Sequence, residues 1–222
     1  MLRAVTLSCQ GEKSERNEDA CIALPGIGVF AAADGVGGNP DGEQASRCIV
    51  ETLYSELSNV QVNQTLIDAA IANANSNVFQ LSGNAEKGKG MASTLVLAWK
   101  TDSRLFCFSV GDSRIYRFRN GNSQQLTKDH VVAVQKANGS KNMVTRAVGL
   151  EAQVVPDVTE WDWFDNDIIL LASDGISDQL SEELITKIVT HQSLSMTDKA
   201  KTLVEESKRR GGRDDKTVVL VF

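Results

Sequence analysis

The sequence predicts an α+β fold with four layers, α-β-β-α, in which a central antiparallel β-sandwich is flanked by helix pairs. Strand-like runs follow one another in groups instead of alternating strictly with helices, which disfavours a doubly wound parallel sheet. Segments with helical periodicity fall into two groups, one near the N-terminal third and one late in the chain. At 222 residues, the chain is expected to form a single domain over residues 1–222.

The expected strands are short runs rich in apolar and β-branched residues. They cover residues 4–9, 20–24, 28–33, 93–99, 105–110, 113–119, 153–158, 167–172 and 217–222. After the sixth run, Asn120-Gly121 predicts a tight hairpin turn, because these residues readily adopt the positive φ that such turns require.

Helices are expected where apolar side chains recur at helical spacing. The first such face consists of Ala45, Ile49, Val50, Leu53 and Leu57. The second consists of Leu66, Ala70, Ile71, Ala74 and Val78. A shorter face, formed by Ala200, Leu203 and Val204, precedes Gly211-Gly212, where a helix is expected to end.

The composition is that of an ordinary soluble protein, with 41% hydrophobic and 23% charged residues. A net charge of −6 disfavours nucleic acid or an anionic membrane as the main partner. No segment resembles a signal peptide or a membrane span, so a cytoplasmic monomer is expected. The four cysteines show no CxxC spacing and are expected to be reduced thiols, not zinc ligands.

Two distant segments, 29–35 and 169–175, share a pattern that points to a cation site. Each is an apolar run that ends on an Asp-Gly pair, at Asp34 and at Asp174, and Asp214 lies just before the last apolar run. A single Asp-Gly pair is usually a turn. Buried strands, however, deliver these carboxylates to the rim of the core, where unpaired anions are very unfavourable. They need hydrogen bonds, a shared proton or a cation, and three of them together predict a metal site.

Oxygen ligands without nearby Cys or paired His select hard cations, which here means Mg²⁺ or Mn²⁺. Two such ions, roughly 3.5–4 Å apart, can share a carboxylate and activate a water that attacks a phosphoryl group. Such a reaction needs no covalent enzyme intermediate.

Eight short motifs follow one another along nearly the whole chain. They are Asn17-Glu18-Asp19-Ala20, Asp34-Gly35-Val36-Gly37-Gly38, Gly90-Met91-Ala92-Ser93-Thr94, Val110-Gly111-Asp112-Ser113-Arg114-Ile115-Tyr116, Leu126-Thr127-Lys128-Asp129-His130, Thr145-Arg146-Ala147-Val148-Gly149, Leu170-Leu171-Ala172-Ser173-Asp174-Gly175 and Asp214-Asp215-Lys216-Thr217. In this order they resemble the metal-dependent protein phosphatases, the protein phosphatase 2C-like family, in its compact bacterial form. No single motif is decisive, but their number and order are specific.

The resemblance implies roles for the residues of the metal site. Asp34 would bridge two metal ions, and the carbonyl of Gly35 would complete the coordination of one of them. Asp174 and Asp214 would hold the second ion. The implied fold is a β-sandwich flanked by helices, as expected from the apolar pattern.

The resemblance also implies outer parts of the site. Glu18 and Asp19 would hold metal-bound waters in the outer shell. Asp112, together with Asp174, matches the position that binds a third, weaker metal in bacterial relatives. The alternative for Asp112 is a structural aspartate paired with Arg114.

One departure concerns the phosphate. The family places an arginine four residues before the acidic residue of the Asn-Glu-Asp motif, and here that position is Ser14. Serine cannot replace the bidentate contact of arginine with phosphate. We expect weaker phosphate binding, or binding by Lys13, Arg16 or another basic residue.

Further departures concern proton transfer, the last motif and the flap. Val36 stands where eukaryotic members have a general-acid histidine, so the leaving group is expected to take its proton from metal-bound water. His130 is expected to shape the fold. Asp215 replaces the usual asparagine, and it either strengthens divalent binding or faces solvent. In the family, the segment between the fifth and sixth motifs builds a flap beside the site. Here that segment, residues 131–144, is short, and the resemblance implies a shortened flap that leaves the site more open.

The sequence therefore predicts a Mg²⁺- or Mn²⁺-dependent phosphatase that hydrolyses phosphoserine and phosphothreonine on proteins and opposes a serine/threonine kinase. One alternative is a degenerate relative that binds phosphoproteins or regulates partners, which the retention of Asp34, Asp174 and Asp214 disfavours. Another is an unrelated hydrolase of small phosphate esters, which the order of the motifs disfavours. The chain has no GxxxxGK[ST] motif for a P-loop.

Overall fold

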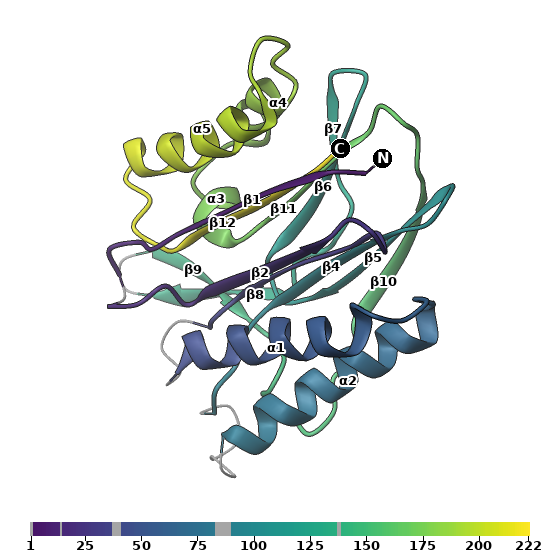
Figure 1. The fold of residues 1–222 in the computed structure, drawn as a ribbon. Coiled ribbons are helices and arrows are strands. Elements are labelled where there is room, and N and C mark those ends of the chain that lie inside the picture. Colours follow the sequence, from purple (N-terminus) through teal and green to yellow (C-terminus); the bar gives the residue numbers. More distant parts are fainter. Residues whose placement is uncertain (1, 14, 37–40, 83–89, 137–138) are drawn as a thin grey trace.

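Two antiparallel sheets lie face to face in the computed structural model, which describes residues 2–13, 15–36, 41–82, 90–136 and 139–222 (Figure 1). The first sheet contains, in spatial order, β1 (Ala4–Cys9), β12 (Lys216–Val221), β11 (Ile168–Ala172), β6 (Arg114–Arg119) and β7 (Asn122–Gln125). The second sheet contains β10 (Asp157–Asp162), β5 (Arg104–Val110), β4 (Leu95–Lys100), β3 (Val29–Asp34) and β2 (Asp19–Leu24).

Helices cover both outer faces of this sandwich. On the second sheet lie α1 (Gly42–Leu57) and α2 (Gln64–Leu81), and on the first sheet lie α3 (Asp174–Ser177), α4 (Glu182–Val189) and α5 (Met196–Arg209) (Figure 1). This four-layer arrangement confirms the predicted α+β fold.

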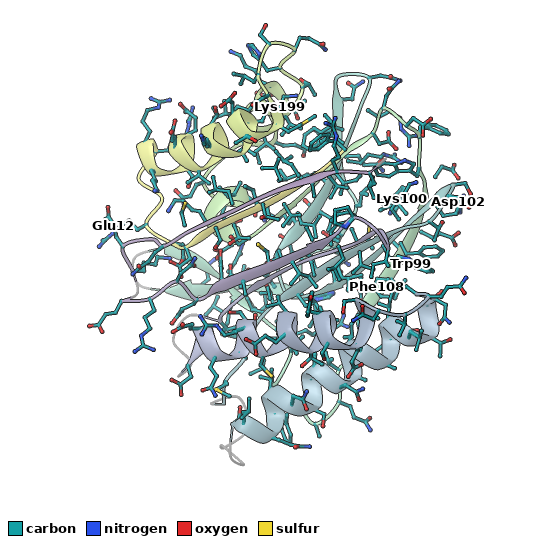
Figure 2. All side chains as sticks on the ribbon, viewed as in Figure 1. Glu12, Trp99, Lys100, Asp102, Phe108 and Lys199 are labelled. Carbon is teal, nitrogen blue, oxygen red and sulfur yellow. The ribbon has the colours of Figure 1, made fainter. Side chains whose placement is uncertain are left out.

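The central strands are buried on both faces, because side chains alternate across a strand. In β3, Val29 and Ala31 pack against α1 and α2, whereas Phe30 and Ala32 pack between the two sheets. Phe108 of β5 points to the helix side of the second sheet (Figure 2). β11 and β12 alternate in the same way between the inter-sheet layer and the α3–α5 layer. Three apolar layers therefore hold the ends of the central strands in place.

The predicted helical faces are largely correct. All five apolar residues predicted for α1 are buried. In α2, Leu66 was expected in the buried face but is 37% exposed, and Ile67 is fully buried instead. The side chain of Asn63 accepts a hydrogen bond from the Leu66 amide at 3.0 Å, which places Leu66 in the capped first turn of the helix.

The expected strand over 153–158 is wrong, since the strand in this region is β10 (Asp157–Asp162). Pro156 has no amide hydrogen to donate to a ladder, so pairing begins after it. β10 is an edge strand with several exposed residues, which weakens its apolar pattern. The turn predicted at Asn120-Gly121 is confirmed, because both residues have positive φ and join the paired strands β6 and β7.

The segment predicted as a shortened flap folds as an antiparallel hairpin of β8 (Val131–Lys136) and β9 (Gly139–Val144). Residues 137–138 lie outside the described residues. The hairpin forms a sheet of its own, separate from the sandwich. Its role beside the active site stays a prediction.

All four cysteines are free thiols, as expected from their spacing. Cys107 is buried, and the other three are partly buried. Over the part of the chain that the structure describes, no helix is both long and apolar enough to cross a membrane.

Replacing Phe30 by alanine should lower the free energy of unfolding by about 3–5 kcal/mol, because it opens a cavity between the two sheets. Phe164→Ala is the matched control, since the Phe164 ring is 57% exposed and lies against the Arg119 guanidinium, 4.1 Å away. This control should cost about 1 kcal/mol or less. Chemical denaturation measures both values, and equal losses would contradict the assignment of Phe30 to the inter-sheet core.

Candidate active site

Carboxylates from both sheets meet at one end of the sandwich. Asp34 is the last residue of β3, and Asp19, the first residue of β2, is its cross-strand partner. Asp174 begins α3, one residue after the end of β11, and Asp214 lies just before β12. Asp112 lies in the connection between β5 and β6. The structure thus brings together five acids that the sequence had singled out.

Burial and the charges of the neighbouring acids raise the pKa values of Asp34, Asp174 and Asp19. Burial and the charges of Asp19, Asp174, Asp112 and Asp214 raise the pKa of Asp34 well above its usual value. Burial, followed by the charges of Asp214 and Asp112, raises the pKa of Asp174 to about 7. Burial also raises the pKa of Asp19 to about 7, against the hydrogen bonds that it accepts. Such a cluster is unfavourable unless positive charge is added to it.

Asp19, which is only 8% exposed, gives the strongest indication that the acid cluster receives a further group. Its Oδ2 accepts a hydrogen bond from Ser173 Oγ at 2.8 Å. Its Oδ1 is buried and has no hydrogen-bond partner among the described residues. A buried carboxylate oxygen without a partner is costly, so Asp19 fits a site that receives a cation or an ordered water.

The donor set also fits a hard divalent ion, because it consists of carboxylate oxygens. Among the described residues, however, no three His, Cys, Asp or Glu side chains are arranged around a common point as a metal site. The fit to Mg²⁺ or Mn²⁺ therefore rests on the donor chemistry, on the mutual repulsion of the acids and on the unpartnered oxygen of Asp19.

Short polar side chains, which the sequence analysis assigned no role, fix the acids in place. Ser93 Oγ donates to the carbonyl of Asp34 at 2.8 Å, and the Asp34 amide donates to Thr94 Oγ1 at 3.1 Å. Ser173 Oγ also accepts from the amide of Thr217 at 2.9 Å. Ser93, Thr94 and Ser173 all belong to recognised motifs, which was the available signal.

The two basic candidates for phosphate binding lie in different surroundings, whereas Ser14 itself lies outside the described residues, as do Gly37 and Gly38. The ammonium group of Lys13 forms an ion pair with Asp214. Arg16 points to Glu43 of α1, at 3.3 Å, and its side chain is 80% exposed. The ion pair described for Lys13 thus involves a member of the acid cluster, and the one described for Arg16 involves α1.

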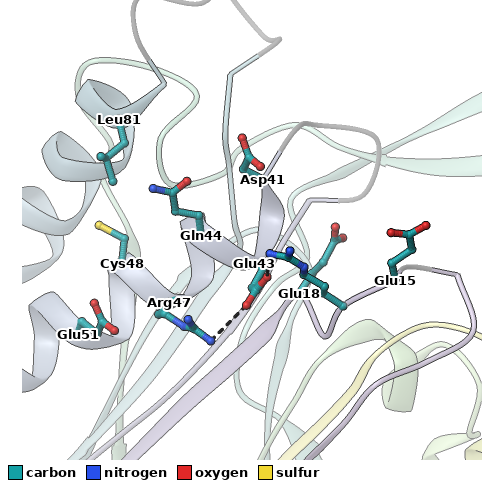
Figure 3. Close-up of a pocket in the computed structure, with 10 residues that line it drawn as sticks. Glu15, Glu18, Asp41, Glu43, Gln44, Arg47, Cys48, Glu51 and Leu81 are labelled. Carbon is teal, nitrogen blue, oxygen red and sulfur yellow. Dashed lines mark hydrogen bonds and ion pairs between the residues drawn. The ribbon is translucent and has the colours of Figure 1, made fainter.

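A cleft of about 780 Å³ lies beside the first turns of α1. It is lined by Glu15, Arg16, Glu18, Asp41, Glu43, Gln44, Arg47, Cys48, Glu51 and Leu81. Figure 3 shows Arg47 reaching Glu43, an ion pair of 3.2 Å. Glu18, predicted for the outer shell, lines this cleft, whereas none of the five clustered acids does.

Two alternatives from the sequence are wrong. Asp112 was a candidate partner of Arg114, but the Arg114 guanidinium binds Asp129 at 2.7 Å and Asp178 at 2.9 Å.

Asp215 was a candidate for a solvent-facing anion, but it is only 4% exposed. Its Oδ1 and Oδ2 accept hydrogen bonds from backbone amides. Gly175 packs against it so closely that a Cβ there would lie 1.8 Å from the Asp215 carbonyl oxygen.

His130 is held at both ring nitrogens. Its Nδ1 accepts a hydrogen bond from the amide of Gly111 at 3.0 Å, and its Nε2 lies 2.9 Å from Arg146 Nη1. Nε2 lies 3.0 Å from Asp157 Oδ2. These contacts link the end of β5 to the start of β10, which agrees with the structural role expected for His130.

Comparisons with known proteins agree with this geometry. Residues 10–207 match the family model described as protein phosphatase 2C. Protein phosphatase PhpP of Streptococcus pneumoniae is 29% identical over 231 residues, which cover 95% of this chain and 93% of PhpP. Serine/threonine protein phosphatase PstP of Mycobacterium tuberculosis is 31% identical over 99% of this chain and 45% of PstP. A crystal structure of the PstP catalytic domain in complex with two manganese ions superposes with a TM-score of 0.84, at 29% identity over 99% of this chain and 97% of that chain.

Replacing Asp34 by asparagine should stabilise the protein in EDTA, because it removes one charge from the acid cluster. We expect the melting temperature at pH 8 to rise by about 2–4 °C, which corresponds to about 1 kcal/mol in a chain of this size. With millimolar Mn²⁺, the wild-type protein should gain stability and the variant should gain little. Asp165→Asn, at an exposed position between β10 and β11, is the control. A lower melting temperature of Asp34→Asn in EDTA would contradict repulsion within the cluster.

Proposed function

This chain belongs to the protein phosphatase 2C family, and on that basis we propose that Asp34, Asp174 and Asp214 hold two divalent ions, Mn²⁺ or Mg²⁺. The chain is a metal-dependent serine/threonine protein phosphatase. The observation that carries the proposal is the approach of four other carboxylates to Asp34 at the end of the sandwich. Asp34 would bridge the ions, with the Gly35 carbonyl as a further ligand, and Asp112 would bind a third ion together with Asp174.

Divalent ions, when bound, supply the charge that polarises phosphoryl oxygens and lowers the pKa of water. The chain's own residues orient the reactants. Asp19 is held through its Oδ2 by Ser173, and its Oδ1, which has no partner among the described residues, would accept from water in the outer shell. Glu18 lines the cleft beside α1 and would hold ordered water in the outer shell. His130 is unsuited to proton transfer, because both its ring nitrogens are engaged.

Lys13 is the better of the two candidates for phosphate binding. The hydrogen bond of its ammonium group to Asp214 holds the pKa of Lys13 above its usual value, and the charges of Asp214, Asp174 and Asp34 act in the same direction. A lysine binds phosphate as a point charge, in contrast to the two parallel bonds of an arginine. Arg16, paired with Glu43, faces the cleft instead.

The substrates in this proposal are proteins that carry phosphoserine or phosphothreonine, opposed by a serine/threonine kinase. Two relatives named as protein phosphatases, PhpP and PstP, match 95% and 99% of this chain and support this substrate class. The free cysteines suit a reducing compartment, and we propose a cytoplasmic monomer.

Hydrolysis of a phosphothreonine peptide and of p-nitrophenyl phosphate should require Mn²⁺ or Mg²⁺ and stop in EDTA. Asp174→Ala should lower kcat/KM by about 100-fold or more, because it removes a ligand of the site. Asp165→Ala, remote from the acids, is the matched control and should retain full activity. Turnover without divalent ions, or none with any of them, would overturn the proposal. Binding of the phosphopeptide without turnover would instead favour a degenerate binding module.

Lys13→Ala should raise KM for the phosphothreonine peptide about tenfold, the equivalent of about 1.4 kcal/mol, because one positive charge on the phosphate is lost. Arg16→Ala is the matched comparison and should change KM by less than about twofold. Steady-state kinetics at saturating Mn²⁺ measure both values. A larger effect of Arg16→Ala would assign the phosphate to Arg16.

A further inference from the structure

The loop that joins β1 to β2 and carries Lys13, described at residues 10–13 and 15–18, lies against the segment just before β12. The amides of Glu12 and Lys13 both donate to the carbonyl of Arg213, at 2.6 and 3.1 Å. The side chains of Glu12 and Arg213 form an ion pair of 3.4 Å. Glu12 marks this loop at the edge of the molecule (Figure 2). Backbone contacts thus dock the loop on the segment that carries Asp214.

One buried carboxylate holds both ends of this loop. Asp215 Oδ1 accepts a hydrogen bond from the amide of Gly11 at 2.6 Å, and its Oδ2 accepts one from the amide of Glu18 at 2.7 Å. Gly11 precedes Lys13, and Glu18 follows it. With only 4% of the residue exposed, Asp215 makes these bonds away from competing water.

Close contact at Gly11 makes the first of these bonds possible. A Cβ at this position would lie 2.3 Å from the carbonyl oxygen of Arg213 and from the carbonyl carbon of Asp214. Any other residue at position 11 would push the loop away from the segment that precedes β12. The close contact at Gly11 and the hydrogen bonds to Asp215 therefore both hold the loop in this position.

A carboxylate suits this position better than an amide does. Each Asp215 oxygen accepts from a different backbone amide, so two acceptors are needed. Asparagine, expected here from the family resemblance, offers one acceptor oxygen and one NH₂ donor. Its NH₂ group would face a backbone N–H, and one end of the loop would lose its bond.

We propose that Asp215 is a positioning residue that presents Lys13 to the phosphate of the substrate. By holding the amides of Gly11 and Glu18, it sets the loop so that the Lys13 ammonium group lies beside Asp214. This inference rests on the phosphate-binding role proposed for Lys13. It also relates the two departures from the family pattern, at positions 14 and 215. Lys13 would supply the positive charge that the family takes from an arginine at position 14, and the Asp215 carboxylate would hold the loop that carries Lys13.

The test measures competitive inhibition by inorganic phosphate in the Mn²⁺-saturated enzyme. Asp215→Asn should raise the inhibition constant about tenfold, because a buried hydrogen bond to a charged group is lost. Lys13→Ala should raise it by a similar factor. In the double variant the two effects should not multiply, because Asp215 acts through Lys13. Asp165→Asn, which removes the same charge at an exposed site, should leave the constant unchanged.

A second variant covers the case in which Asp215→Asn does not fold. Gly11→Ala displaces the same loop and leaves the carboxylate intact, so it should raise the phosphate inhibition constant by a similar factor. An effect of Lys13→Ala without one of Asp215→Asn or Gly11→Ala would overturn this inference alone. Multiplied effects in the double variant would also overturn it. No effect of Lys13→Ala would overturn both this inference and the phosphate role of Lys13.

Discussion

Electrostatic repulsion among carboxylates at one end of the β-sandwich is the constraint on which the site depends. Asp19, Asp34, Asp112, Asp174 and Asp214 come from both sheets, and burial together with their mutual charges raises the pKa of Asp34 well above its usual value. No single strand could assemble such a group. Three apolar layers hold the strand ends together against this repulsion, so the fold's stability maintains an arrangement that favours positive charge.

Hydrogen bonds to the backbone make this arrangement precise. Ser93 and Thr94 fix the main chain of Asp34, and Ser173 links Asp19 in the second sheet to Thr217 in the first. These bonds orient the acids without neutralising them. The cluster thereby gains a defined geometry, which is what a divalent ion and its phosphate substrate require.

The layered fold and the acids Asp34 and Asp174 could be predicted, because both depend on local patterns: side-chain alternation, helical spacing and an Asp-Gly pair after an apolar run. The contacts of Lys13 and Asp215 could not. They join segments about 200 residues apart, as in the 204-residue separation of the Gly11–Asp215 bond. No local pattern tells whether an acid such as Asp215 is buried against a distant amide or exposed.

The most direct test of the account is electron paramagnetic resonance of the protein titrated with Mn²⁺. If Asp34 bridges two ions, the titration should reach two Mn²⁺ per chain with an exchange-coupled signal, since the ions would lie only about 3.5–4 Å apart. Signals of isolated ions at every Mn²⁺ level, or saturation at one ion per chain, would contradict it. The acids would then surround a single cation, and the role of Asp34 as a bridge would be wrong.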